Sequence, residues 1–115
     1  MNRGDVWIAA GGPDYAGKPR SVVLVQSDRF DATLSVTICG LTTTAIDRPW
    51  ARLRVTPTPA NGLERPSWLM VDKLMTIPRR KLNHRIGQLG PDDTQRLSDA
   101  LMVFLGLTER GRPGA

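Results

Sequence analysis

An arginine and a run of threonines are the side chains of this sequence that best suit phosphate chemistry. Arg20 precedes an apolar run, Val22 to Val25, and the threonines 42–44 follow a second run that ends at Leu41. If the two runs form neighbouring strands, the guanidinium and the hydroxyls converge near one sheet edge. A guanidinium is a planar, permanently charged donor for phosphate oxygens, and a hydroxyl can hold one of those oxygens. The pattern therefore indicates a site that handles phosphate groups.

Cleavage of RNA is one phosphate reaction that needs little more than these groups. The 2′-hydroxyl of RNA can attack the adjacent phosphate, so an enzyme has only to orient the sugar, stabilise the crowded phosphorane and assist proton movement. The single cysteine, Cys39, and the single histidine, His84, cannot form a zinc site. His84 suits proton transfer near neutral pH, but it lies in a basic cluster far along the chain from Arg20, which favours an ordinary surface histidine.

Two alternatives for the basic residues remain open from the residues alone. Arg20 could be a strand-end arginine that pairs with Asp5 or Asp72. Sixteen Lys and Arg against eleven Asp and Glu give a net charge of +5 and an isoelectric point near 10.3, which favours nucleic acid or an anionic membrane as partner but also fits a solvated basic surface.

The segment from Trp50 to Val55 alternates between apolar and basic residues. Its second face carries Trp50, Arg52 and Arg54, which could track phosphates while stacking a base, although a solvated strand face is the commoner meaning of such a pattern. The densest basic cluster follows Pro78 and runs over residues 79–85, where it indicates either an electrostatic footprint for nucleic acid or a charged turn.

The elements that must position these residues are short strands followed by one helix. We expect strands within residues 5–10, 22–25, 34–41, 50–55, 68–71, 74–77 and 86–89, a long loop over 11–19 that is either a flap or a plain hairpin connection, and irregular chain over 56–66. A helix should start near Gly90, bury a stripe of Leu97, Ala100, Leu101, Phe104 and Leu105, and stop at Gly106.

This pattern predicts an α+β fold that is mainly β: a small SH3-like antiparallel barrel with a C-terminal amphipathic helix packed against it. The 115 residues form one domain over 1–107, and residues 108–115 form a tail that frays. Because residues 1–10 contain no signal-peptide stretch and no 18 apolar residues run together, we expect a soluble cytoplasmic protein whose lone Cys39 is buried in a reducing compartment.

Several motifs occur here in the order and spacing of a known family. The sequence contains Arg-Gly-Asp-Val-Trp at 3–7, Arg-x-Val-Val-Leu-Val at 20–25 and Leu-Thr-Thr-Thr at 41–44, followed by Asn-Gly-Leu at 61–63, Pro-Ser at 66–67, Leu-Met-Val-Asp at 69–72, Met-Thr-Ile at 75–77 and Ile-Gly-Gln-Leu at 86–89. Over nearly its whole length the chain resembles the MazF/PemK family of toxin endoribonucleases, which share their barrel with the CcdB family.

The resemblance implies a function. A MazF-like chain would be the toxin of a type II toxin–antitoxin system, a metal-independent endoribonuclease that cuts single-stranded RNA at a short recognition sequence, in messenger RNA and also in ribosomal or transfer RNA, and so inhibits translation and growth. It would need no cofactor, act as a homodimer, and be neutralised by a MazE-like antitoxin whose acidic tail lies over the RNA groove and reshapes the loop at 11–19.

The resemblance also implies site residues. Arg20 matches the family's catalytic arginine and Thr42 its catalytic threonine, with Thr43 as the nearest competing assignment. The further RNA-binding candidates are Lys18, Thr43, Thr44, Trp50, Arg52, Asp72, Lys73, Arg79 and Arg80. The family has proline after the arginine, whereas this chain has Ser21 there and a proline at position 19, which affects loop geometry and the preferred RNA sequence.

Two further functions remain as alternatives. The same barrel could belong to a CcdB-like toxin that poisons gyrase through its C-terminal residues, although residues 110–115 lack the aromatic anchor that this role calls for. The chain could also be a nucleic-acid-binding module of SH3-like type without catalysis.

Overall fold

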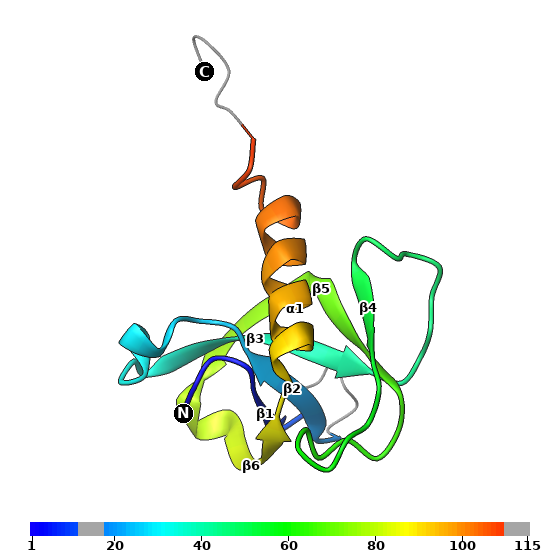
Figure 1. The fold of residues 1–115 in the computed structure, drawn as a ribbon. Helices are drawn as coiled ribbons and strands as arrows, with labels where there is room; N and C mark the ends of the chain where they lie inside the picture. The colour runs from blue at the N-terminus through cyan, green and yellow to red at the C-terminus, as the bar shows by residue number, and fades with distance from the viewer. Residues whose placement is uncertain (12–17, 110–115) are drawn as a thin grey trace, which may run out of the picture.

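The computed structural model describes residues 1–11 and 18–109, which form one antiparallel sheet and a C-terminal helix (Figure 1). The strands are β1 (Asp5–Ala9), β2 (Arg20–Leu24), β3 (Ser35–Thr42), β4 (Arg52–Val55), β5 (Ser67–Pro78) and β6 (Leu82–Gln88). Two short 3-10 helices, η2 (Asp28–Phe30) and η3 (Arg79–Lys81), interrupt them, and α1 (Pro91–Phe104) closes the chain. The mainly-β fold with one terminal helix is therefore confirmed.

The sheet is not closed into a barrel. Its strand order is β4-β5-β3-β2-β1-β6, so β4 and β6 are edge strands, and no ladder joins them within the described residues. The chain between β4 and β5 fills the gap instead: the Gln88 amide donates to the Ala60 carbonyl oxygen at 2.9 Å. The expected barrel closure is corrected to an open sheet, because this proline-rich connection, and not a strand, reaches β6.

The predicted pairing of the two central strands is confirmed. β2 pairs antiparallel with β3 through Val22↔Gly40, Val23↔Cys39 and Leu24↔Ile38. The same register, continued by two residues, places Arg20 opposite Thr42. Because facing residues of an antiparallel pair project to the same side of the sheet, the guanidinium and this threonine share one face.

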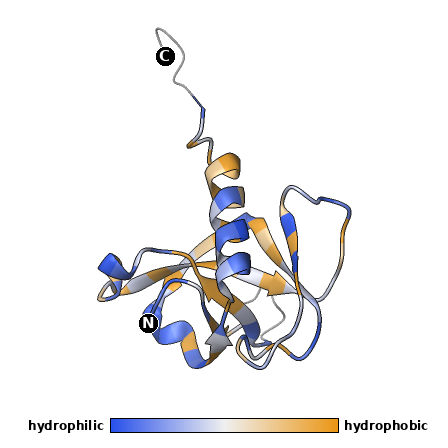
Figure 2. Cartoon of the chain, viewed as in Figure 1, coloured by the Kyte–Doolittle hydropathy of each residue, from blue (hydrophilic) through white to orange (hydrophobic). Residues whose placement is uncertain are grey.

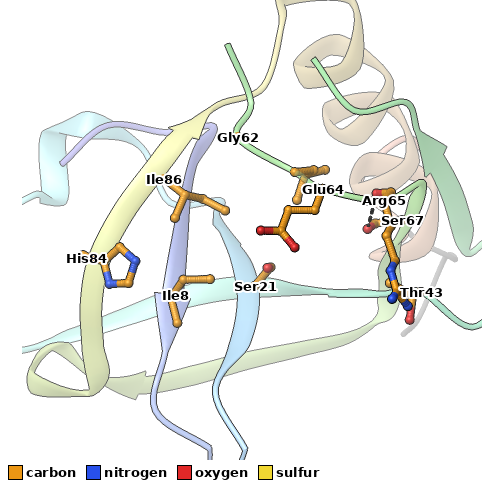
Figure 3. A pocket seen from close by; sticks show the side chains of 10 residues that line it. Ile8, Ser21, Thr43, Gly62, Glu64, Arg65, Ser67, His84 and Ile86 are labelled. Atoms are coloured by element: carbon orange, nitrogen blue, oxygen red, sulfur yellow. Dashed lines mark hydrogen bonds between the residues drawn. The ribbon is translucent and has the colours of Figure 1, made fainter. Parts of the chain in front are cut away.

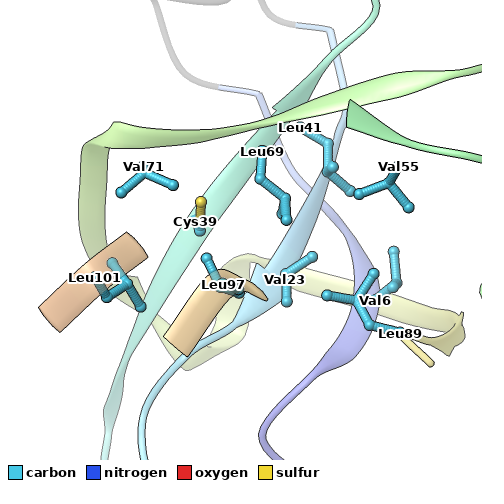
Figure 4. Packing of buried hydrophobic residues seen from close by; sticks show 10 residues of the cluster. All are labelled: Val6, Val23, Cys39, Leu41, Val55, Leu69, Val71, Leu89, Leu97 and Leu101. Carbon is cyan, nitrogen blue, oxygen red and sulfur yellow. The ribbon is translucent and has the colours of Figure 1, made fainter. Parts of the chain in front are cut away.

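Both faces of the central strands are buried. On one face, α1 covers a cluster that includes Val23, Cys39, Leu69 and Leu97 (Figure 4). On the other face, Val22 packs in a second cluster whose members also include Ala9, Leu24, Val36 and Ile38. β3, expected to be half-buried, is thus enclosed on both faces over residues 38–41, and its alternating apolar side chains contribute to two cores.

The helix begins and ends as its sequence predicts. Pro91 occupies its first turn, and the amides of Gly106 and Leu107 bond back to the carbonyls of Val103 and Met102 around a left-handed Gly106 with φ +71°. Leu97 and Leu101 are buried as expected.

The expected burial of Phe104 and Leu105 is wrong. Their exposed fractions are 42% and 52%, because the last turn of α1 projects beyond the sheet (Figures 1 and 2).

No helix among the described residues is long and apolar enough to cross a membrane. Residues 12–17 of the predicted loop and 110–115 of the predicted tail lie outside the described residues.

The buried thiol gives a test of the core. Cys39 is fully buried, and burial raises its pKa to about 12. Because the thiolate is the reactive species, we expect the native protein to resist labelling by a disulfide reagent at pH 8, whereas the urea-unfolded protein should label at once. Rapid stoichiometric labelling of the native protein would contradict the packing of β3 between two cores.

Candidate active site

Arg20 and Thr42 lie in one hollow at the end of the β2–β3 pair. The hollow has a volume of about 180 Å³, and its lining residues are Arg20, Val22, Gly40, Leu41, Thr42, Thr44 and Met70. Arg20 is exposed and Thr42 is half-buried, so both polar groups are accessible to a ligand. The proximity that the sequence predicted for the guanidinium and the threonine hydroxyl is thus present in the structure.

The hollow has an apolar floor and an oriented hydroxyl. Met70 lies over Gly40, where an added Cβ would stand 2.7 Å from the Met70 Cε atom. The Thr44 amide donates to Thr42 Oγ1 at 3.1 Å, which fixes the hydroxyl oxygen and leaves its hydrogen to donate to a ligand. A phosphate oxygen placed here would meet a cation and a positioned hydroxyl.

The structure separates Thr42 from the competing Thr43. Thr44 lines the Arg20 hollow together with Thr42, whereas Thr43 lines a second, larger cavity of about 380 Å³ (Figure 3). β3 ends at Thr42, and the chain bends at Thr43, which faces the other cavity. Geometry therefore favours Thr42 as the hydroxyl that works with Arg20.

Arg52 is not placed as the sequence suggested. We expected it on an exposed basic face, but its side chain is only 6% exposed, and its Nε atom donates to Asp72 Oδ1 at 3.0 Å. Arg48 reaches the other oxygen of Asp72 at 3.5 Å. Arg52 and Asp72 thus form an ion pair between the neighbouring strands β4 and β5.

The remaining predicted contacts lie outside both cavities. Lys18, Lys73 and Arg80 are exposed, as is Trp50 with an exposed fraction of 62%. Arg79 holds a neighbouring loop: its Nε atom donates to the Thr33 carbonyl oxygen at 2.7 Å, and the guanidinium also bonds to the carbonyl oxygen of Asp31. None of these five residues lines either cavity, although Lys18 lies two residues from Arg20 along the chain.

Asp5 and Asp72, the two carboxylates that the sequence offered as partners of Arg20, contact other arginines. Arg85 Nε lies 3.2 Å from Asp5 Oδ1, and Asp72 binds Arg52 and Arg48. Among the described residues, no group of three or more His, Cys, Asp or Glu side chains could hold a metal ion.

Sequence analysis missed the larger cavity. Its lining residues are Ile8, Ser21, Thr43, Gly62, Leu63, Glu64, Arg65, Ser67, His84 and Ile86. The one available signal was alternation: Ser21 and Thr43 adjoin Arg20 and Thr42 and must project to the opposite face. Glu64 and Arg65 belong to an irregular loop whose position no periodicity predicts.

Comparison with known proteins decides the family. A family model described as PemK-like, MazF-like toxin of type II toxin–antitoxin systems matches residues 2–105. The chain belongs to this toxin family. The toxin is also 51% identical over 107 residues to a protein of Mycolicibacterium smegmatis named probable endoribonuclease MazF, a match that covers 93% of this chain and 98% of that protein.

Solved structures agree with the family. The Mycobacterium tuberculosis toxin MazF-mt6 superimposes with a TM-score of 0.74 at 26% identity, covering 89% of this toxin and 96% of that chain. A mycobacterial endoribonuclease in complex with its cognate antitoxin gives a TM-score of 0.76 at 23% identity, and the match covers 93% of this toxin and 96% of that chain. The predicted MazF/PemK resemblance is therefore confirmed, and the family match favours it over the CcdB-like alternative.

The Arg52–Asp72 pair predicts a pH-dependent contribution to stability. Burial alone would raise the pKa of Asp72, but the hydrogen bond and charge of Arg52 outweigh it and hold that pKa below its usual 3.8. Asp72→Asn leaves a buried guanidinium without its counter-ion, so we expect the free energy of unfolding at pH 7 to fall by about 3 kcal/mol in urea titrations.

Urea titrations of both proteins at a series of pH values separate the loss of the ion pair from a change in side-chain packing. A carboxylate with a lowered pKa in the folded state stabilises the protein above its unfolded pKa, and this contribution is lost as the pH falls through the folded value. The difference between wild type and Asp72→Asn should therefore narrow below about pH 3.8, while the exposed control Asp47→Asn stays close to wild type. A difference that does not change with pH would contradict the ion-pair account.

Proposed function

We propose that this chain, a MazF-type toxin endoribonuclease by its family and its relative, cuts single-stranded RNA at a short recognition sequence and thereby inhibits translation and growth. The observation that carries the proposal is the hollow in which the β2–β3 register sets Arg20 beside Thr42. This pair supplies what a scissile phosphate needs: a fixed positive charge and an oriented hydroxyl.

The reaction uses the RNA's own nucleophile. The 2′-oxygen attacks the neighbouring phosphorus and forms a new P–O2′ bond while the P–O5′ bond breaks. The 2′-hydroxyl loses its proton and the departing 5′-oxygen gains one, so the products are a 2′,3′-cyclic phosphate and a 5′-hydroxyl. No electron transfer and no external co-reactant enter this step, and a metal ion is not required for it.

The protein contributes orientation and charge stabilisation. Negative charge builds on the non-bridging oxygens as the phosphorane forms, and the Arg20 guanidinium is placed to bind them. Thr42, whose oxygen is fixed by the Thr44 amide, donates its hydrogen to one of the same oxygens. Such pre-placed donors favour the transition state over the ground state because they need no rearrangement as the charge develops.

The proposed partners follow from the family and the charge. We propose a cognate MazE-like antitoxin and a homodimeric toxin, in keeping with a mycobacterial endoribonuclease solved in complex with its cognate antitoxin and a MazE–MazF structure from Deinococcus radiodurans. The net charge of +5 favours both an RNA substrate and an acidic antitoxin segment.

Arg20→Ala tests the proposal. We expect it to lower the cleavage of a long unstructured RNA in EDTA by at least about a hundredfold, because a donor that meets the developing charge is removed. The control is Arg29→Ala, which removes the same charge from exposed η2 beyond the far end of β2 and should cut like wild type. Full activity of purified, folded Arg20→Ala would remove this arginine from the mechanism.

The assignment of the threonine has its own test. Thr42→Val preserves shape but removes the hydroxyl, and we expect the single-turnover cleavage rate to fall by about ten- to a hundredfold. Thr43→Val should cause a smaller loss of that rate, since Thr43 lines the other cavity. The reverse order of effects would transfer the role to Thr43.

A further inference from the structure

The larger cavity lies directly behind the proposed catalytic pair. Ser21 and Thr43 line it, and their sequence neighbours Arg20 and Thr42 line the smaller hollow on the opposite face. Because both cavities reach the same end of the β2–β3 pair, an RNA strand that passes around this edge of the sheet can place its phosphate on one side and a base on the other. The cavity volume of about 380 Å³ accommodates a single base.

The floor of the cavity is a row across three strands. Ile8 of β1 pairs with Ser21 of β2 on one side and with His84 of β6 on the other. Ile86 adds a second aliphatic side chain beside Ile8 (Figure 3). The floor is therefore apolar at its centre, with an imidazole at one end and a hydroxyl at the other, which suits a flat ring that stacks on side chains.

The opposite wall is a loop held firmly in place. Asn61 is almost fully buried, and its Oδ1 atom accepts hydrogen bonds from the amides of Thr58 and Leu63, both at 3.0 Å. Gly62 adopts φ +71° and packs so close to β6 that an added Cβ would stand 2.1 Å from the Ile86 carbonyl oxygen. These contacts fix the loop that carries Glu64 and make the cavity wall pre-formed.

Glu64 gives the cavity a recognition group. Its carboxylate points into the same space as the Ser21 hydroxyl (Figure 3). An ionised carboxylate only accepts hydrogen bonds, so it selects a base that presents two adjacent N–H donors. Guanine alone among the RNA bases does so, with N1–H and the N2 amino group, and its neighbouring O6 can accept from a hydroxyl such as that of Ser21.

We propose that this cavity is a guanine-binding subsite that helps to set the RNA sequence at which the toxin cuts. Glu64 reads the N1–H and N2–H₂ edge, Ile8 and Ile86 contact the ring, and His84 stacks at its end. Arg65, at the rim beside Thr43, is placed for a backbone phosphate. The inference deepens the proposed ribonuclease function and rests on it for the identity of the ligand.

The test compares guanine with inosine, which lacks only the N2 amino group. In the Arg20→Ala background, short single-stranded RNAs of one guanine-containing sequence that the protein binds carry inosine in place of guanine at one position at a time, and binding is followed by fluorescence anisotropy. With Glu64 present, we expect inosine at one position to weaken binding by about tenfold. The guanine-to-inosine ratio is the ratio of the binding affinities for the two RNAs. Adding Glu64→Ala should bring this ratio near one.

Two control variants separate base recognition by Glu64 from a general charge effect and from stacking. Glu109→Ala removes the same charge from an exposed site after α1 and should keep the full guanine-to-inosine ratio. His84→Ala should weaken guanine and inosine RNAs equally, because stacking does not distinguish them. Glu64 is itself exposed, so its replacement should leave the fold intact.

The outcomes distinguish the two proposals. The subsite would be overturned if Glu64→Ala leaves the ratio unchanged, or if inosine weakens binding at no position, even if the wild type cuts RNA. A guanine preference that needs Glu64, in a protein that never cuts, would support the subsite and overturn the ribonuclease. Loss of the ratio in Glu109→Ala as well would show a general charge effect and also overturn the subsite.

Discussion

The antiparallel register between β2 and β3 is the constraint on which the site depends. It places Val22 opposite Gly40 at the last pair of the ladder, and Arg20 and Thr42, two residues beyond, line one hollow. A slip by one residue would move every side chain of β2 to the other face, and both faces here are packed against separate apolar clusters. The burial of the two strands therefore fixes the position of the guanidinium relative to the hydroxyl, without a direct bond between them being needed.

The open edges of the sheet are the second determinant of the surface. Because β4 and β6 are not paired, the connection over residues 56–66 is free to pack on β6, where Asn61 and Gly62 hold it. This packing forms one wall of the larger cavity, beside the Arg20–Thr42 hollow. The Arg52–Asp72 pair secures β4 to β5, so residues that resemble a nucleic-acid surface in the sequence stabilise the fold instead.

Periodicity and motif order predicted most of the strands, the terminal helix and the Arg20–Thr42 proximity, because these depend on local patterns of apolar residues. The strands expected at 68–71 and 74–77 are instead one strand, β5, and the last strand begins at Leu82 rather than at Ile86. They did not predict barrel opening, which depends on how one irregular loop packs. The sequence pattern also did not predict the burial of Arg52, since the alternation of a strand does not show which of its faces is covered. Phe104 fits the helical stripe, yet it is exposed because the helix is longer than the sheet it covers.

In the proposed reaction, the Arg20–Thr42 hollow promotes attack by the RNA's own 2′-hydroxyl. The most direct measurement uses an RNA with one 2′-deoxy nucleotide immediately 5′ to the mapped scissile phosphate, incubated with the wild-type toxin in EDTA beside the all-RNA substrate. We expect the deoxy substitution to stop cleavage at that bond, while the all-RNA strand yields a 2′,3′-cyclic phosphate. Cleavage of the deoxy-substituted bond at the normal rate would contradict this mechanism.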